Sequence, residues 1–190
     1  SDNIYISNST FKNNLRGDDY INFFRCDNVL VTNSVFENIL NDAIDSDFSS
    51  FKSDIVSFKN IGNDAIDGSG SNVIISNSTF ENVMDKAISA GEKSYFEVKN
   101  STFINNEIAL VAKDESHLIC LNNYLEKNRL DIVSFKKKKI FNYPIVFISN
   151  TMVSNYLVEE NTIINGLDDV IFSKDIESKL YGNIYGKASE

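Results

Sequence analysis

The segment from Asn72 to Ser94 reads NVIISNSTFENVMDKAISAGEKS. It decides the fold, because related segments recur along the chain with a period of about 22 residues. Short apolar groups such as Val73–Ile75 are broken by Asn and Ser, and no run has helical spacing. Aligned copies place one residue type in one column. The columns are Ala43, Ala65, Ala87 and Ala109; Ile44, Ile66, Ile88 and Leu110; and Phe36, Phe58, Phe80 and Phe103. A fixed period of this kind is typical of a solenoid, whose repeats pack on their neighbours.

The period and the residue types predict an all-β fold, a right-handed parallel β-helix. About 22 residues accommodate three short strands with their turns, which together make one coil of such a helix. Leucine-rich repeats have a similar period, but their LxxLxL signature is missing from this chain. Armadillo and tetratricopeptide repeats are longer and strongly helical, so both classes are excluded.

A recurrent N-S-T-F-x-N block supports the same fold. It occurs at Asn8–Asn13, Asn77–Asn82 and Asn100–Asn105, with a close copy at Asn33–Asn38. With these blocks the chain resembles the right-handed parallel β-helix proteins, the broad group that includes pectate lyases and many surface proteins. The phrases NDAID, DGSGSN, DKAISAGEKS and AKDES also resemble β-helix modules attached to spore-coat CotH-like proteins. The resemblance spans roughly residues 2–128 and implies the fold.

The length of 190 residues predicts a single domain, residues 1–190. Regular coils are expected over about residues 2–128, and irregular coils with a C-terminal cap over about residues 129–190, because the aligned register weakens after Asn128. The basic run Lys136–Lys139 is expected in a solvated loop. The first residues already belong to a coil, so we expect the sequence to be part of a larger chain.

The net charge and the hydropathy of the chain limit the classes of partner that it is expected to bind. The formal net charge is −9, which argues against nucleic acid or an anionic membrane surface as the main partner. No stretch approaches the roughly 18 consecutive apolar residues of a membrane span, so no membrane span is expected. Many β-helix proteins of the resembling group are displayed outside the cell, and we expect this chain to be secreted or on the cell surface.

Alternation along a strand predicts which columns face solvent. If the isoleucine column points inward, the column two residues later does so too. The expected inward columns are Ile44, Ile66, Ile88, Leu110 and Ser46, Gly68, Ala90, Ala112. The expected outward columns are Asp45, Asp67, Ser89, Val111 and Asp47, Ser69, Gly91, Lys113. The alanine column is also expected to face outward and to leave an open strip of small side chains.

Five aspartates in adjacent coils form a candidate metal site. Asp45 over Asp67, like Asp42 over Asp64, places like charges about 4.8 Å apart, which is destabilising unless solvent, a proton, a cation or a lysine relieves the repulsion. Clustered carboxylate oxygens suit Ca²⁺, the one candidate cofactor. The candidate metal ligands are Asp42, Asp45, Asp47, Asp64 and Asp67. The alternative is that these residues cap turns and face water.

Two lysines lie near these aspartates in the aligned repeats. The layout resembles in kind the calcium-dependent β-helix polysaccharide lyases, where an acidic cluster holds Ca²⁺ against a uronate carboxylate and a Lys or Arg removes the C5 proton. That resemblance implies two candidate catalytic residues, Lys86 as the base and Lys113 as a ligand of a substrate carboxylate. The chain departs from the lyases because no full lyase motif is present and Arg is scarce. The alternative role of Lys86 is an ion pair with Asp64 or Asp85.

The sequence therefore predicts an extracellular or surface β-helix that binds a glycan or serves as a structural or adhesive module, with or without Ca²⁺. A polysaccharide or other glycan is the expected partner, and nucleic acid is not. The expected binding residues are Asp45, Asp47, Asp67, Ser69 and Ser89. The alternative is a calcium-dependent uronate lyase or a fragment of a related carbohydrate-active enzyme. The residues leave open whether the protein is an enzyme.

Overall fold

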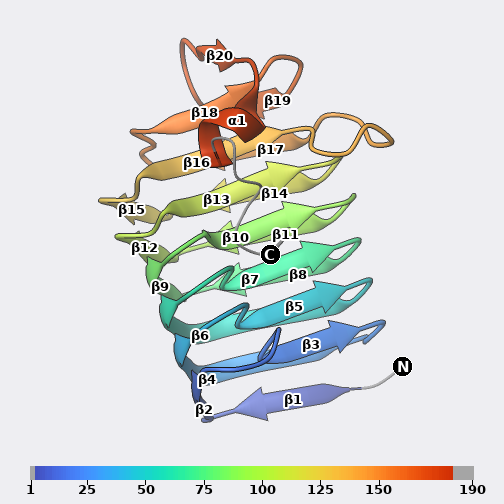
Figure 1. The fold of residues 1–190 in the computed structure, drawn as a ribbon, viewed down its shortest axis with the longest axis vertical. Coiled ribbons are helices and arrows are strands. Elements are labelled where there is room, and N and C mark those ends of the chain that lie inside the picture. The colour runs from blue at the N-terminus through green and yellow to red at the C-terminus, as the bar shows by residue number, and fades with distance from the viewer. Residues whose placement is uncertain (1–2, 182–190) are drawn as a thin grey trace.

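The chain folds into a stack of β-coils (Figure 1). The computed structural model describes residues 3–181, and the strands in this part form a parallel solenoid of about seven turns. The predicted all-β class and the coil length of about 22 residues are confirmed. Each strand pairs in parallel and in register with the corresponding strand one coil away, so every residue stacks on its counterpart in the next coil.

Each coil contributes strands to three walls. Wall 1 consists of the first halves of β4 (Val29–Ile39) and β6 (Ser50–Ile61) with β1 (Ile4–Ser7), β8 (Asn72–Ser76), β11 (Tyr95–Lys99), β14 (His117–Leu121), β17 (Ile145–Ser149) and β19 (Ile163–Asn165). Wall 2 consists of the second halves of β4 and β6 with β2 (Thr10–Asn14), β9 (Thr79–Val83), β12 (Thr102–Ile104) and β15 (Tyr124–Glu126). Wall 3 is a separate sheet of β3 (Ile21–Phe24), β5 (Ile44–Asp47), β7 (Ile66–Ser69), β10 (Lys86–Gly91), β13 (Ile108–Lys113), β16 (Leu130–Phe135), β18 (Tyr156–Glu159) and β20 (Phe172–Ser173).

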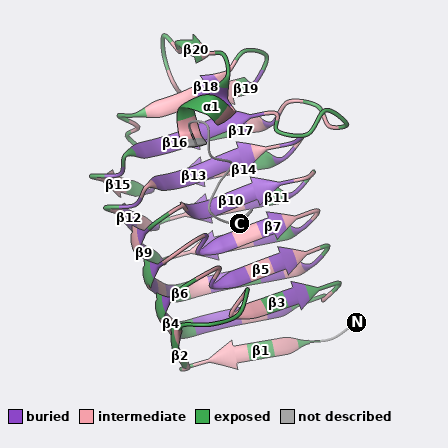
Figure 2. Cartoon of the chain, in the orientation of Figure 1, coloured by how far each residue is buried: buried purple, intermediate pink, exposed green. Residues whose placement is uncertain are grey.

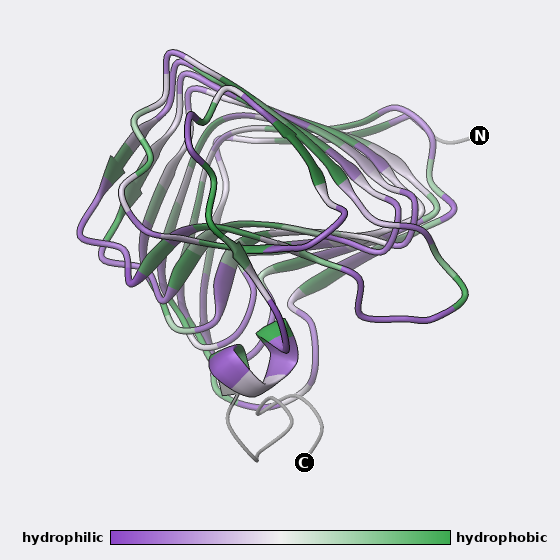
Figure 3. Ribbon diagram, turned by 90° about the horizontal axis from the view of Figure 1, so that it is seen from above, coloured by the Kyte–Doolittle hydropathy of each residue, from purple (hydrophilic) through white to green (hydrophobic). Residues whose placement is uncertain are grey.

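A short helix, α1 (Ile176–Tyr181), follows the last strand of wall 3. Seen along the solenoid axis, the coils superpose into a ring and α1 lies outside it (Figure 3). No helix in the described part of the chain is long and apolar enough to cross a bilayer.

The core lies inside the ring. Buried residues alternate with more exposed ones along strands such as β8 and β11, and Figure 2 shows the burial along the chain. Its most regular feature is a stack of phenylalanine rings on the inner side of wall 2. Adjacent ring centroids lie 4.7–5.0 Å apart along this stack. The stacked rings are Phe11, Phe36, Phe58, Phe80 and Phe103. The predicted phenylalanine column is therefore confirmed as core.

The N-S-T-F-x-N block places each of its residues for a physical reason. Its first Asn, such as Asn77 with φ 50°, turns the chain from wall 1 to wall 2 in the left-handed region, which Asn tolerates better than most residues. The buried hydroxyl of Ser78 accepts from the N–H of Val56 at 3.2 Å and donates to the carbonyl of Ser76 at 2.8 Å. Phe80 then enters the stack. One block thus forms a corner, satisfies a buried amide and fills the core.

The last Asn of the block forms a ladder along the solenoid. The side-chain amide of Asn60 donates to Asn38 at 2.9 Å, and that of Asn82 donates to Asn60 at 3.1 Å. Asn105 continues the ladder to Asn82 at 2.6 Å. All four have positive φ values of 55–58°. The repeated Asn therefore both turns the chain and joins one coil to the next.

Regular pairing continues beyond Asn128, further than the sequence pattern predicts. β14 pairs with β17, and β16 pairs with β18, in the same parallel register as the earlier coils. An insertion after β16 lengthens one coil, so the stacked residues Asn122 and Asn150 are separated by 28 positions. An alignment with a fixed period cannot follow this change. The run Lys136–Lys139 lies in the insertion and is mostly exposed, as expected of a solvated loop.

Truncating the phenylalanine stack tests the fold. Phe80→Ala should lower the free energy of unfolding by about 3–5 kcal/mol, because the ring is fully buried between two others and its removal leaves a cavity. Chemical denaturation measures the change. Phe24→Ala, at an exposed ring, is the control and should cost less than about 1 kcal/mol. A similarly small cost at Phe80 would contradict a packed core.

One coil has a poor residue at the corner between walls 1 and 2. Ile55 has φ 56° and occupies the place that Asn33 and Asn77 take in the neighbouring coils, although a β-branched side chain disfavours this backbone region. Because Ile55 is exposed, Ile55→Asn should raise the stability by about 1 kcal/mol through relief of strain. Thermal unfolding measures the gain. Ile55→Val keeps the β-branch and should show none; equal stability of both variants would argue against strain.

Candidate functional site

The predicted acidic columns meet on the outer side of wall 3. β5 pairs with β7 so that Asp45 lies beside Asp67, and Asp47 lies beside Ser69. These four side chains are half-buried, and the residues that alternate with them are buried in the core. The predicted inward and outward orientations are confirmed for these two strands.

The alanine column does not face outward, so the prediction of an open strip is wrong. All four alanines are fully buried and belong to the main core: Ala43, Ala65, Ala87 and Ala109. The chain bends at this position, and the pairing of β10 with β13 joins Lys86 to Ile108 and Ile88 to Leu110 while it skips the alanines between them. Two consecutive side chains therefore face the core, and alternation fails at this corner.

The corner that leads into wall 3 carries carboxylates bound to backbone amides. The N–H of Asp64 donates to Oδ1 of Asp42 at 2.8 Å. The N–H of Lys86 donates to Oδ1 of Asp64 at 3.0 Å. Each of these two aspartates thus satisfies an amide of the next coil, which is the capping role that the sequence left open as an alternative to metal binding.

Lys86 is buried in a group of carboxylates. Its Nζ lies 3.1 Å from Oδ1 of Asp64 and also contacts Asp85. These are the two ion pairs that the sequence offered as the alternative to a catalytic base. To approach a substrate, the ammonium group would have to leave both carboxylates, and breaking a buried ion pair is costly.

Lys113 reaches across one coil to Asp67. Its Nζ lies 3.8 Å from Oδ1 of Asp67, although β10 runs between their two strands. Gly91 provides the path, since a Cβ at that position would lie 2.9 Å from Cε of Lys113. The outward glycine thus lets a lysine two coils away offset the charge of a carboxylate.

The C-terminal end of wall 3 is covered from outside. Ile176 of α1 belongs, with Val111, Val133 and Phe135, to a second apolar cluster. Ser89, one of the predicted binding residues, is also fully buried and therefore does not belong to an accessible surface. The predicted outward positions on β5 and β7 remain partly exposed. We call this part of wall 3 the acidic face, formed by Asp45, Asp47, Asp67 and Ser69.

Two exposed aromatic residues border the acidic face and were not identified from the sequence. Phe24 pairs in register with Asp47, and Phe48 directly follows β5. Their rings lie 6.4 Å apart in an edge-to-face arrangement and are 56% and 58% exposed. Phe48 has φ 50°, which is uncommon for a bulky residue, and its ring lies over Gly70. The sequence did carry a signal for this site, because Phe48 occupies the turn column in which the next coil has Gly70.

Burial, together with neighbouring negative charge, raises carboxyl pKa values in this region, most of all those of Asp42 and Asp45. Burial, followed by the charge of Asp64, raises the pKa of Asp42 to about 8. Burial, followed by the charges of Asp47 and Asp67, raises the pKa of Asp45 to about 7. The repulsion between stacked aspartates that the sequence predicts is thus partly relieved by protonation.

Asp67 and Asp19 complete the electrostatics. Burial alone would raise the pKa of Asp67, but the charge of Lys113 and hydrogen bonds lower it below the ordinary value, so this carboxylate stays ionised. Asp19, from the loop before β3, was not identified from the sequence. Burial raises its pKa, and its charge acts on Asp45. The side-chain amide of Asn22 donates to Oδ2 of Asp45 at 2.7 Å, which leaves Oδ1 for other partners.

The five predicted metal ligands fall into two groups. Asp42 and Asp64 accept backbone N–H groups at the corner, whereas the other three lie on the acidic face. Within residues 3–181, no group of three or more His, Cys, Asp or Glu side chains is arranged to hold a metal ion. Side chains of the described residues therefore do not form a complete Ca²⁺ site, and Ca²⁺ binding stays a prediction.

Comparisons with known proteins do not assign the chain to a family. Protein-family models, curated proteins and solved structures were each compared with the chain, and none matches. The function is therefore inferred from the acidic face and its two aromatic neighbours.

The raised pKa values predict how stability depends on pH. The folded carboxyls of Asp42 and Asp45 keep their protons at pH values where an unfolded Asp, with its ordinary pKa of 3.8, has lost its own. The folded state thus binds more protons between about pH 4 and pH 8, so the contribution of these groups to stability falls as the pH rises through that window. We expect a lower Tm at pH 8 than at pH 5.

Asp42→Asn separates this effect from others. Asn keeps the Oδ1 acceptor for the N–H of Asp64 but never ionises, so the variant should have a Tm a few degrees above the parent at pH 8 and close to it at pH 5. Asp168→Asn, at an exposed position, is the control, and the difference in its Tm between pH 5 and pH 8 should equal that of the parent. A variant less stable than the parent at pH 8 would contradict the assignment.

Proposed function

We propose that this protein is a non-catalytic glycan-binding solenoid and that the acidic face is its binding surface. The observation that supports this most directly is the juxtaposition of two exposed aromatic rings, Phe24 and Phe48, with the half-buried carboxyl groups of Asp45 and Asp47. Polar and aromatic groups of this kind, fixed on a rigid sheet, suit a ligand that has both hydroxyl groups and apolar C–H faces. A sugar ring has both.

The two types of side chain divide the recognition. Aromatic rings offer flat apolar surfaces, and Phe48 presents its ring to solvent from a strained turn, a feature that clusters at functional sites. Carboxylates accept hydrogen bonds from hydroxyl donors. Asp45 and Asp47 lie two residues apart on the same strand, so both face the same side, and Ser69 adds a hydroxyl one coil later.

The charge of this surface favours neutral glycans. Asp67 is held ionised by Lys113, and further aspartates surround it, so an anionic uronate would meet like charge. A uronate would need a cation between its carboxylate and the acidic face. We therefore propose Ca²⁺ as an auxiliary ligand shared by Asp45, Asp67 and an acidic glycan, with the glycan completing the coordination.

The lyase stays the competing proposal, and the placement of Lys86 weighs against it. Its ammonium group lies between Asp64 and Asp85 at the buried corner, whereas the acidic face lies on the strands that follow. Lys113 is already paired with Asp67, although that pair is long enough at 3.8 Å for an incoming carboxylate to compete. A binding role requires neither lysine to move.

A secreted or cell-surface location belongs to the same proposal, because polysaccharides and other glycans are encountered there. Kinship with pectate-lyase-like or CotH-like β-helices is likewise proposed. It is supported by the parallel coil architecture and the N-S-T-F-x-N blocks, which show how the fold is built and carry no catalytic group.

Binding to a panel of neutral and uronate oligosaccharides, with Ca²⁺ and with a chelator, tests the proposed function. We expect the parent protein to bind a neutral glycan under both conditions. Phe48→Asn should weaken binding about tenfold, because a stacking surface is lost while Asn is compatible with the left-handed backbone. Calorimetry on the best ligand measures the change.

Tyr124→Asn removes an equally exposed ring from wall 2 and is the matched control, with no expected loss of binding. Absence of binding to every glycan tested would overturn the proposal. Binding of uronates only with Ca²⁺, weakened by Asp67→Asn, would support the calcium-bridged form. Release of unsaturated uronate products that Lys86→Ala abolishes would replace the binder with the lyase.

A further inference from the structure

We propose that wall 1 is a self-complementary interface through which two copies of this chain form an antiparallel, two-fold symmetric dimer. This surface is distinct from the acidic face on wall 3, so the inference is independent of the proposed function. It rests on the order of charged, apolar and bulky residues along the outward columns of wall 1, which are continuous through seven coils.

From β1 to β17, the central outward column of wall 1 reads the same in both directions by chemical type. It consists of Tyr5, Leu30, Lys52, Ile74, Glu97, Ile119 and Phe147, and Asn165 of β19 follows at one end. Ile74 is the midpoint. One coil away on either side stand opposite charges, two coils away stand aliphatic side chains, and three coils away stand exposed aromatic rings.

A two-fold axis along the strand direction, passing over Ile74, makes these types meet. It leaves the strand direction unchanged and reverses the order of the coils in the second copy. Lys52 of one copy then faces Glu97 of the other, and Leu30 faces Ile119. Tyr5 and Phe147, which are 66% and 45% exposed, meet at the two ends.

The neighbouring outward column is complementary under the same operation. Its residues are Ser7, Thr32, Asp54, Ser76, Lys99, Leu121 and Ser149. Ser76 faces its own copy on the axis, and Asp54 faces Lys99 of the second copy. Two independent columns therefore place opposite charges together about the same axis. The alternative axis, parallel to the solenoid, would place Lys52 on Lys52 and Glu97 on Glu97, which is repulsive.

Lys52 and Glu97 do not pair with each other within one chain. Lys52 and Glu97 are separated by Ile74, so they are two coils, or about 9.6 Å, apart along the column. Among residues 3–181, Lys52 forms no ion pair, whereas Glu97 contacts Lys99 at 2.8 Å. A second copy would bring a carboxylate to Lys52 and would extend the Glu97–Lys99 pair into a network.

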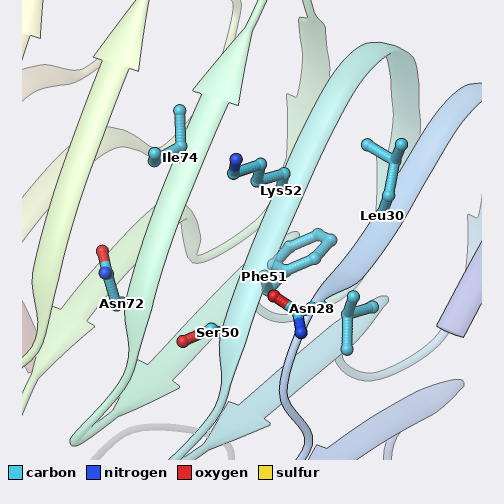
Figure 4. A pocket seen from close by; sticks show the side chains of 8 residues that line it. Asn28, Leu30, Ser50, Phe51, Lys52, Asn72 and Ile74 are labelled. Atoms are coloured by element: carbon cyan, nitrogen blue, oxygen red, sulfur yellow. The ribbon is translucent and has the colours of Figure 1, made fainter. Parts of the chain in front are cut away.

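Shape follows the same pattern. A groove of about 210 Å³ on wall 1 is lined by residues that include Ser50, Lys52 and Ile74 (Figure 4). In the proposed dimer, Ser50 faces Tyr95 of the second copy, since these residues lie one coil to either side of Asn72 in the third outward column. The bulky, partly exposed ring of Tyr95 would thus enter the groove.

The surface is large enough for a modest specific contact. Seven coils at about 4.8 Å and five residues at about 3.3 Å give about 34 Å by 17 Å, or about 550 Å² per copy. The total of about 1,100 Å² lies just below the about 1,200–2,000 Å² of specific, stable interfaces, in the range of weaker contacts. Parallel sheets are also usually covered on both faces, and no element among the described residues covers wall 1.

Charge exchange provides the test, with sedimentation velocity as the measurement. The parent protein should be dimeric at about 100 µM, a concentration suited to a micromolar dissociation constant. Lys52→Glu should weaken the dimer by more than about tenfold, because two Glu–Glu contacts replace two ion pairs. Glu97→Lys should do the same with two Lys–Lys contacts. An equimolar mixture of the two variants should form a heterodimer, in which both contacts pair opposite charges again.

Lys59→Glu makes the same charge change on wall 2 and is the matched control, which should stay dimeric. Circular dichroism confirms that each variant keeps its β-structure. A monomeric parent at the highest concentration would overturn the proposal. So would single variants that dimerise as well as the parent, or a mixture of variants that stays monomeric.

Discussion

In-register stacking of parallel coils is the constraint on which the rest of this structure depends. Each residue stands about 4.8 Å from its counterpart in the next coil. Where the repeat keeps one residue type in a column, identical side chains therefore contact each other along the solenoid. For phenylalanine the result is a continuous ring stack, and for asparagine it is an amide ladder. For aspartate it is repulsion. The same geometry therefore stabilises wall 2 and creates the electrostatic problem of wall 3.

Wall 3 resolves the repulsion in three ways that differ by position. At the corner, each aspartate accepts an amide N–H of the next coil, and Lys86 ends the series. On the acidic face, Lys113 reaches Asp67 across Gly91. Among residues 3–181, Asp42 and Asp45 have no lysine partner, and their raised pKa values, about 8 and about 7, express the cost that is left. A hydroxyl-rich or cationic ligand would lower that cost, which links the packing problem to the proposed binding role.

Much of this architecture could be predicted from the sequence, because a period of one coil leaves a regular mark on composition. The phenylalanine column, the inward Ile44 column and the stacking of Asp45 on Asp67 all follow from alignment and alternation. The alanine corner did not follow, since alternation holds within a strand and not through a bend. Neither did the burial of Val111, because Ile176 of α1 joins the same outer apolar cluster from the far end of the sequence, outside the repeat. The reach of Lys113 was missed because it connects neighbouring columns.

Walls 1 and 2 show that the same stacking can either pair opposite charges within one chain or leave them apart. Over the first four coils of wall 2 the outward column alternates in sign, from Lys12 to Glu37, Lys59 and Glu81, so opposite charges are adjacent within the chain. On wall 1 the opposite charges Lys52 and Glu97 are separated by one apolar coil, too far to pair directly. Their order is complementary only to a reversed copy of itself. Charge spacing along a column, rather than charge content, therefore distinguishes a surface suited to water from one suited to a partner.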